Sequence, residues 1–197
     1  MSLPGEEAQL MMAPIERLRE LKRKALEAQN ARRAGVMVLF YPDLEAQTRF
    51  ALILRKTYKG VHSAQIGFPG GSFEPQDTDL MATALRETEE EIGVDPNRVE
   101  VIKELTHVYI PPSNFYVHPY MGLTTHTPEF RLQPSEVEDL LEVDLPQFMS
   151  DDQLTHRVLT TSYATQIKVP AFELNGHIVW GATAMMLNEV RELLKQI

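Results

Sequence analysis

One amphipathic helix constrains this 197-residue chain more than any other feature. Residues 78–92 place apolar side chains at helical spacing, Asp77 precedes them as a possible N-cap, and Gly93 follows as a C-terminal stop. The side that would pack against a core carries Leu80, Met81, Ala84, Leu85, Thr88 and Ile92. The pattern therefore predicts a helix with one buried face.

The other side of this helix is acidic. With about 100° per residue, Glu87, Glu90 and Glu91 fall within an arc of roughly 100°, and Arg86 neighbours Glu90 at the i,i+4 spacing. Like charges so close repel each other, and hard divalent cations such as Mg²⁺ or Mn²⁺ offset that repulsion with oxygen coordination. Such a cation also binds substrate phosphates and lowers the pKa of a bound water. We therefore predict a metal site here, with Arg86 holding a ligand in place.

A glycine pair precedes the helix. Gly70 and Gly71 allow the backbone to bend tightly and to approach a ligand, which suits a phosphate or a carbonyl–metal contact. Charge runs are usually solvated helix faces, and most glycine pairs are simple turns. The combination of both features on one capped helix favours a functional site over a solvated helix face that merely follows a turn.

Residues 86–93 read Arg-Glu-Thr-Glu-Glu-Glu-Ile-Gly, and this segment resembles the Nudix box. The resemblance implies an α/β/α sandwich with a mixed sheet and hydrolysis of a nucleoside diphosphate linked to another group. It implies Mg²⁺ or Mn²⁺ held by Glu87, Glu90 and Glu91, with the Gly71 carbonyl nearby. We assign the catalytic role to Glu90, Glu87 and Arg86. The family's isolated glutamate is Thr78 here, and the loop is one residue longer, so Asp77 or Glu74 is expected to replace that glutamate.

The segment before the helix resembles a subgroup of that family, the coenzyme A pyrophosphatases. The matching positions are Arg55, His62, Gln65 and the tetrad Phe68-Pro69-Gly70-Gly71. The subgroup cuts coenzyme A derivatives to 3′,5′-ADP and a phosphopantetheine, which implies substrate contacts from Arg55, His62, Gln65, Gly70 and Gly71. An ADP-ribose or nucleotide-sugar pyrophosphatase and a non-catalytic nucleotide-sensing domain are the alternatives. A distal glutamate is an additional base or ligand in such proteins, and Glu136 and Glu138 are both candidates.

The rest of the chain alternates short apolar runs with turns and helical patterns. Strands are expected at 36–41, 49–54, 99–108, 115–123, 158–161, 167–174 and 177–180. Residues 135–143 fit a strand or a helix, residues 56–71 a loop, residues 145–149 a short helix and residues 182–195 a closing helix. We expect a flexible segment over 1–14 and a single domain over 15–197, which opens with a helix at 15–31. This order indicates an α/β fold.

Composition limits the partners. The formal net charge of −9 does not favour a nucleic-acid surface, since phosphate backbones select basic faces. The absence of cysteine excludes disulfides, thiol catalysis and Cys-ligated zinc. No apolar run approaches the length of a membrane span, and the N-terminus lacks a secretory pattern. We expect a cytoplasmic protein that acts on a small nucleotide diphosphate, with a homodimer as a possible assembly.

Overall fold

A mixed eight-stranded sheet forms the centre of the molecule, for which we use a computed structural model that describes residues 5–24, 27–56, 65–161 and 164–197. Its main path runs β3-β2-β1-β7-β5, with β4 paired to β1, β6 to β7 and β8 to β2. The strands are β1 (Arg32–Pro42), β2 (Thr48–Arg55), β3 (Ile66–Gly67), β4 (Gly70–Ser72), β5 (Glu100–Glu104), β6 (Val108–Ile110), β7 (Phe115–Leu123) and β8 (Val137–Asp144). β1 and β7 are parallel, whereas β1 and β2 form an antiparallel hairpin, so the predicted mixed sheet is confirmed.

A second, antiparallel sheet follows in the chain. It contains β9 (Leu154–Leu159), β10 (Ile167–Leu174) and β11 (His177–Trp180), and it is reached through α4 (Leu145–Met149) and the 3₁₀ turn η3 (Asp151–Gln153). The predicted turn between β10 and β11 is confirmed, with positive φ at both Asn175 (50°) and Gly176 (77°). The chain then enters α5 (Gly181–Leu194).

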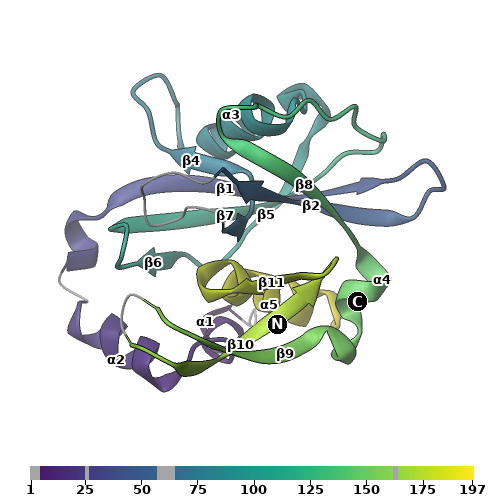
Figure 1. Cartoon of the computed structure of the whole chain (residues 1–197). Helices are drawn as coiled ribbons and strands as arrows, with labels where there is room; N and C mark the ends of the chain where they lie inside the picture. The colour runs from purple at the N-terminus through teal and green to yellow at the C-terminus, as the bar shows by residue number, and fades with distance from the viewer. Residues whose placement is uncertain (1–4, 25–26, 57–64, 162–163) are drawn as a thin grey trace.

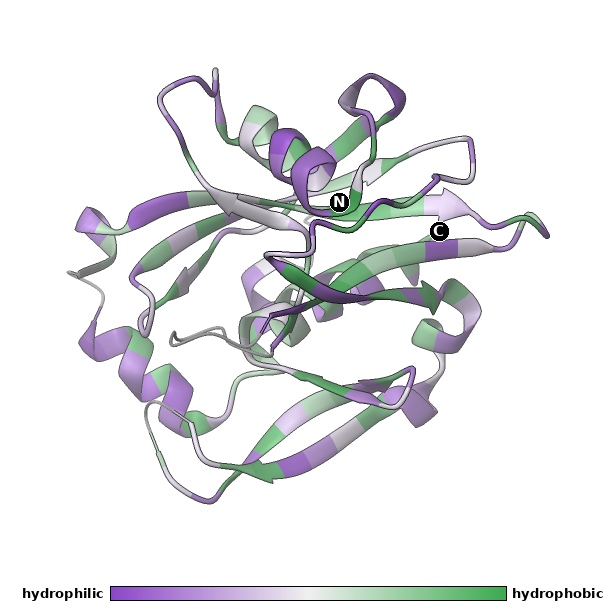
Figure 2. Ribbon diagram, turned by 45° about the horizontal axis from the view of Figure 1, so that its top comes forward, coloured by the Kyte–Doolittle hydropathy of each residue, from purple (hydrophilic) through white to green (hydrophobic). Residues whose placement is uncertain are grey.

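These elements pack in layers on the two faces of the main sheet (Figure 1). The helix α3 (Leu80–Ile92) lies on one face, over buried side chains that include Met37, Leu39 and Tyr41. The other face packs against α5 and the second sheet through a larger apolar cluster, and both apolar layers are visible in Figure 2. Gly35 lets α3 approach β1, because a Cβ there would lie 2.2 Å from the Leu80 carbonyl oxygen. The architecture confirms the predicted α/β class, with a sheet-and-helix layer opposite α3.

The N-terminal helices differ from the prediction. The segment expected to be flexible contains α1 (Gly5–Leu10). The helix expected over 15–31 ends earlier, as α2 (Ile15–Arg23), and is followed by the 3₁₀ turn η1 (Glu27–Asn30). α1 is held by α5: Gln9 Nε2 donates to a Glu189 carboxylate oxygen at 2.7 Å, and Asn188 Nδ2 donates to the Ala8 carbonyl at 2.7 Å. Contacts across about 180 residues stabilise this short helix, and local sequence carries no sign of them.

The start of α3 also differs from the prediction. The helix begins at Leu80, and its N-cap is Asp79, whose carboxylate accepts from the Ala82 N–H at 2.7 Å. Asp77 is engaged elsewhere, as described below. The C-terminal stop is confirmed, since Gly93 adopts φ 76°.

Further boundaries differ by short segments. The expected loop 56–71 overlaps the short strands β3 and β4. In place of the single strand expected at 99–108, the chain forms the 3₁₀ turn η2 (Pro96–Arg98), β5 and β6. The 135–143 stretch, which fitted a strand or a helix, overlaps the strand β8. None of the helices in the described part of the chain has both the length and the apolar character needed to cross a membrane.

Candidate active site

The acidic face of α3 is turned toward β4. Gly71 in β4 lies directly against Glu87: a Cβ added at Gly71 would lie 2.3 Å from Glu87 Oε1 and 2.4 Å from its carboxyl carbon. Real Cβ atoms do not approach other atoms this closely, so any side chain at residue 71 would displace the Glu87 carboxylate from this position. β4 in turn is fixed by its antiparallel pairing with β1, in which Gly71 lies opposite Gly35.

Arg86 links the helix to the loop before it. Its Nε and Nη2 donate to the two carboxylate oxygens of Asp77 at 2.8 and 3.1 Å, and its Nη1 donates to Glu87 and to Glu90, both at 3.0 Å. Asp77 also accepts from the Thr83 hydroxyl at 2.8 Å. The Arg86 guanidinium therefore holds the pKa of Asp77 far below its ordinary value. Asp77 and Glu74 were both expected to replace the missing family glutamate, and it is Asp77 that pairs with Arg86.

Glu91 is the buried member of the acidic face, with a side chain 1% exposed. Its Oε2 accepts from the Gly70 N–H at 2.8 Å. Its Oε1 lies 3.1 Å from Arg55 Nη1 in an ion pair, but it accepts no hydrogen bond from the residues that the structure describes. Burial raises the pKa of Glu91 to about 7, although the charge of Arg55 and the Gly70 N–H act in the opposite direction.

Arg55 joins this buried carboxylate to the glycine loop. Its Nη2 donates to the Gly70 carbonyl at 2.6 Å, so one guanidinium contacts both Glu91 and the backbone of β4. Arg55 thereby fixes the position of the glycine pair relative to α3. The resemblance implied a substrate contact for this residue, and that role stays a prediction.

The carboxylates of Glu87 and Glu136 complete the electrostatic environment of the acidic cluster. Burial raises the pKa of Glu87, and the negative charges of Glu90 and Glu136 act in the same direction. Glu136, which immediately precedes β8, also acts on Glu91. Glu138 is turned elsewhere and lies 3.8 Å from Lys56 Nζ. Glu136 therefore acts on the acidic cluster electrostatically, whereas the contact recorded for Glu138 is its ion pair with Lys56.

This cluster fits a divalent cation. Burial raises the pKa of Glu91 even though Arg55 pairs with it, so Arg55 alone does not offset the burial of this carboxylate. Its Oε1 also accepts no hydrogen bond from the described part of the chain. Glu87 and Glu91 offer hard oxygen ligands beside the Gly71 backbone, which is the ligand type that Mg²⁺ and Mn²⁺ prefer. The Glu90 side chain is 56% exposed, so Glu90 is more accessible than Glu87 and Glu91. Its carboxylate and that of Glu87 both accept from Arg86 Nη1. The ligand roles of these glutamates remain predictions.

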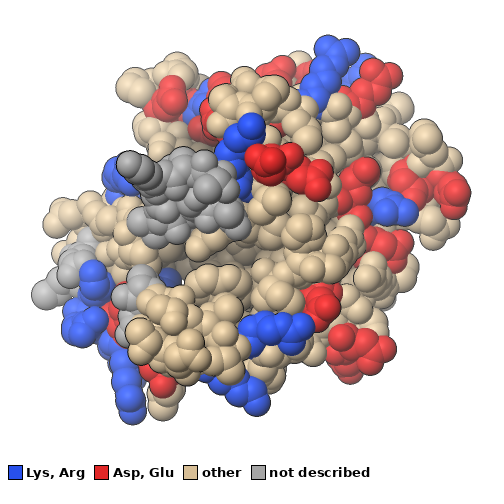
Figure 3. Space-filling view, in the orientation of Figure 1, with Lys and Arg blue, Asp and Glu red and all other residues tan. Residues whose placement is uncertain are grey.

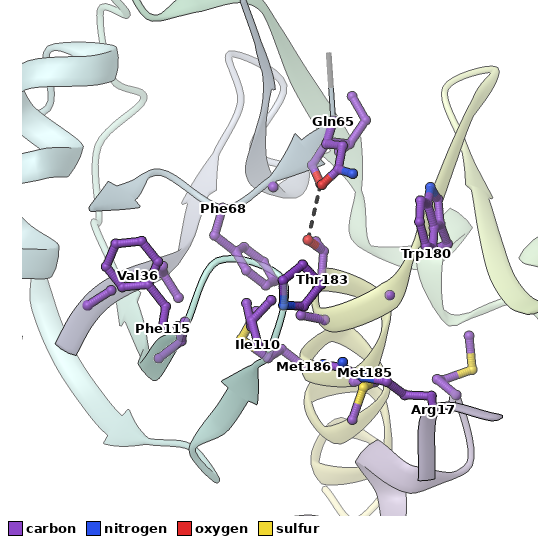
Figure 4. Close-up of a pocket in the computed structure, with 18 of the residues that line it drawn as sticks. Arg17, Val36, Gln65, Phe68, Ile110, Phe115, Trp180, Thr183, Met185 and Met186 are labelled. Atoms are coloured by element: carbon purple, nitrogen blue, oxygen red, sulfur yellow. Dashed lines mark hydrogen bonds between the residues drawn. The ribbon is translucent and has the colours of Figure 1, made fainter. Parts of the chain in front are cut away.

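A cavity of about 510 Å³ opens beside this cluster, between the main sheet and the layer that contains α5 (Figure 4). Four predicted substrate residues are part of its lining: Arg55, Gln65, Gly70 and Gly71. Arg55 and Gly70 contact Glu91, and Gly71 lies against Glu87, so the cavity adjoins the acidic cluster. His62 lies outside the described residues. The rest of the lining is mainly apolar and includes Val36, Ile110, Phe115, Trp180, Met185 and Met186. In the space-filling view the surface is recessed between the two layers, with charged side chains above the recess (Figure 3).

Sequence reasoning missed the contribution of the C-terminal elements to this cavity. Trp180 and Thr183 come from the junction of β11 and α5, and the Thr183 hydroxyl donates to the Ile66 carbonyl at 3.1 Å, across more than a hundred residues. Phe115 in β7 packs against the apolar core and also lines the cavity. The single tryptophan of the chain, placed directly before a helical pattern, is the local signal for this region.

Comparison with known proteins agrees with this geometry. The NUDIX domain family matches residues 31–163. An uncharacterized Nudix hydrolase NudL of Photorhabdus laumondii is 30% identical over 131 residues, which are 66% of this chain and 69% of that protein. The peroxisomal coenzyme A diphosphatase ndx-8 of Caenorhabditis elegans is 25% identical over 174 residues, which are 87% of this chain and 73% of that protein.

A solved structure supports the fold. A crystal structure of a Nudix hydrolase from M. smegmatis, RenU, superposes with a TM-score of 0.56 at 13% identity and covers 85% of this chain and 88% of that one. At that identity the likeness concerns the fold alone. The family match spans the glycine loop, the acidic helix and Glu136, which are the elements that form the site. The chain therefore belongs to the Nudix family and is a Nudix pyrophosphohydrolase.

Proposed function

We propose that this enzyme hydrolyses the diphosphate of coenzyme A or an acyl-coenzyme A, with Mg²⁺ or Mn²⁺ as cofactor. The observation that carries the proposal is the mainly apolar cavity whose lining includes Arg55, Gln65, Gly70 and Gly71. Volumes of about 300–1,000 Å³ are typical of small-molecule sites, so this one has room for one half of such a substrate. The pantetheine arm and an acyl chain are the parts that suit an apolar lining.

The relatives support the same choice of substrate. The C. elegans protein named a coenzyme A diphosphatase is similar along 87% of this chain. The motif around Arg55, Gln65 and the Phe-Pro-Gly-Gly tetrad resembles the same subgroup.

The side chains at the acidic cluster have separate tasks in this proposal. Glu87, Glu90 and Glu91 would hold the metal, with the Gly71 carbonyl beside them. A bound divalent metal supplies charge stabilisation at the phosphoryl oxygens and a more acidic water. Arg86 positions Glu87 and Glu90, and it is itself fixed by Asp77. Arg55, at the opening of the cavity, would donate to a substrate phosphate, a charge-assisted contact.

Two carboxylates are candidates for the general base, Glu90 and Glu136. Glu90 is exposed to the solvent side of the cluster and is our sequence-based choice. Glu136 immediately precedes β8 and acts electrostatically on both Glu87 and Glu91. A base facing the cluster from a separate element can take a proton from an attacking water without giving up a metal-ligand position.

The test is product analysis on a small panel. Coenzyme A, a short and a long acyl-coenzyme A, ADP-ribose and a nucleotide sugar are each incubated with Mg²⁺ or Mn²⁺, and Glu90→Gln serves as the inactive control. We expect 3′,5′-ADP and a phosphopantetheine product from the coenzyme A compounds, with the highest kcat/KM in the panel. Faster turnover of ADP-ribose would replace the substrate assignment. Binding without turnover, unchanged by Glu90→Gln, would instead support a nucleotide-sensing domain.

A further inference from the structure

A second group of metal-ligating side chains lies outside the acidic cluster. Glu104 ends β5, His107 lies in the link between β5 and β6, and His118 is in the middle of β7. This part of the sheet flanks β1 on the β7 side, whereas the glycine loop pairs with β1 as β4. The Nudix chemistry described above uses none of these three residues.

The three side chains converge on one carboxylate oxygen. Glu104 Oε1 lies 2.9 Å from His107 Nε2 and 3.0 Å from His118 Nδ1, and the Tyr120 hydroxyl donates to it at 3.3 Å. The imidazole rings of His107 and His118 lie side by side, with centroids 3.6 Å apart and planes inclined by 34°. One ligand atom from each of the three residues lies within 4.8 Å of the other two.

These separations are close to those of a metal site. With bonds of about 2.0–2.1 Å to nitrogen and oxygen, the ligand atoms of a tetrahedral zinc ion lie roughly 3.3 Å apart. The two imidazole nitrogens of His107 and His118 would need to retreat from Glu104 Oε1 by only about 0.3–0.4 Å to admit an ion. Two imidazoles and a carboxylate leave a fourth position for water.

The surroundings of the three residues also suit a metal site. His118 is buried, and its imidazole ring stacks on that of His107 with centroids 3.6 Å apart. The Tyr120 hydroxyl orients the Glu104 carboxylate, as groups that contact a ligand residue commonly do in metal sites.

We propose that Glu104, His107 and His118 form a second metal site, which binds Zn²⁺ or a similar transition-metal ion. Imidazole ligands select such ions over Mg²⁺, which prefers oxygen, so this site and the acidic helix differ in the metal that they take. Binding would join the end of β5 and the link to β6 to β7 near the edge of the main sheet. The site thus stabilises the sheet independently of the substrate.

The test uses the full-length chain without an affinity tag, in a Glu87→Gln/Glu90→Gln background that weakens the acidic site. Co²⁺ is titrated and followed by its visible absorption, and the affinity for Zn²⁺ is measured by competition with a chromophoric chelator in excess Mg²⁺. We expect about one equivalent of Zn²⁺ and a Co²⁺ spectrum of nitrogen and oxygen ligation. Absence of saturable Zn²⁺ binding in this background would overturn the proposal.

Three variants assign the ligands. His107→Ala and Glu104→Gln should each weaken Zn²⁺ binding at least tenfold, and His107 and Glu104 are exposed enough that neither change leaves a buried cavity. His126→Ala, at an exposed histidine elsewhere on the surface, is the matched control and should retain the parent affinity. Circular dichroism verifies that each variant is folded. Parent-like Zn²⁺ affinity in both ligand variants would contradict the assignment.

Discussion

Gly71 lies directly against the Glu87 carboxylate: a Cβ added at residue 71 would lie 2.3 Å from Glu87 Oε1. The position of Glu87 in the acidic cluster therefore depends on the absence of a side chain at residue 71. This relationship joins the two halves of the family motif, the glycine loop and the helix, by direct contact.

Gly71→Ala is the first prediction. The added methyl group must displace Glu87, and a misplacement of about 1 Å at a reacting centre costs roughly 10²-fold in rate. We expect kcat on the preferred substrate to fall by about 10²-fold while the protein stays folded. Gly67→Ala is the matched control, since a Cβ there meets nothing closer than 3.9 Å. Equal losses in both variants would show that the effect is not specific to the Glu87 contact.

The second prediction separates Glu136 from Glu138. Glu136 acts electrostatically on Glu87 and Glu91, whereas Glu138 lies beside Lys56. If Glu136 is the base, Glu136→Gln should lower kcat by about 10²–10⁴-fold with little change in KM, because general-base catalysis contributes that much. Glu138→Gln should leave kcat within about twofold. Single-turnover rates of both variants at saturating Mg²⁺ provide the measurement, and a Glu138→Gln defect as large as that of Glu136→Gln would refute the choice.

The third prediction concerns stability in acid. The Arg86 guanidinium lowers the pKa of the buried Asp77 carboxylate in the folded state, so this stabilisation is present above the ordinary pKa near 3.8 and is lost as the pH falls further. Asp77→Asn should cost about 2–3 kcal/mol in the free energy of unfolding at pH 7, as expected for hydrogen bonds to a charged group. The difference from the parent should shrink below about pH 4.

Urea unfolding between pH 2.5 and 7 measures this effect. Asp139→Asn replaces an exposed aspartate in β8 and serves as the control, with the pH dependence of the parent. A deficit in Asp77→Asn that stays constant across the whole range would show that the Arg86 pair is not its origin.

The fourth prediction concerns metal and Glu91. A buried carboxylate whose pKa is raised by burial destabilises the fold at neutral and alkaline pH unless a cation neutralises it. Glu91→Gln removes this charge and still offers an oxygen to the Gly70 N–H. At pH 8 in EDTA we expect the variant to have a higher Tm than the parent. On addition of Mn²⁺ its Tm should rise less than that of the parent.

Differential scanning calorimetry with and without Mn²⁺ gives both values. Glu89→Gln alters an exposed carboxylate on the same helix and should behave as the parent does. A Mn²⁺-induced rise in Glu91→Gln as large as in the parent would mean that Glu91 is not a ligand.

The sequence alone determined the local features of this protein. The acidic arc of α3, its stop at Gly93 and the hairpin turn at Asn175-Gly176 were all predictable, because helical periodicity and positive-φ turns depend on residues close together in the chain. The strands of the hairpin β1–β2 followed from their apolar runs for the same reason.

The tertiary structure decided how these features are used. Glu90 and Glu91 are neighbours on the same helical arc, yet Glu91 is buried against Gly70 and Arg55 while Glu90 is exposed, because β4 covers only one of them. α1 is held by hydrogen bonds to α5, from the other end of the chain, and to the Thr106 carbonyl. Sheet pairing likewise brings His118 to Glu104, fourteen residues away. Burial and long-range pairing depend on the packing of distant segments, and no local pattern encodes them.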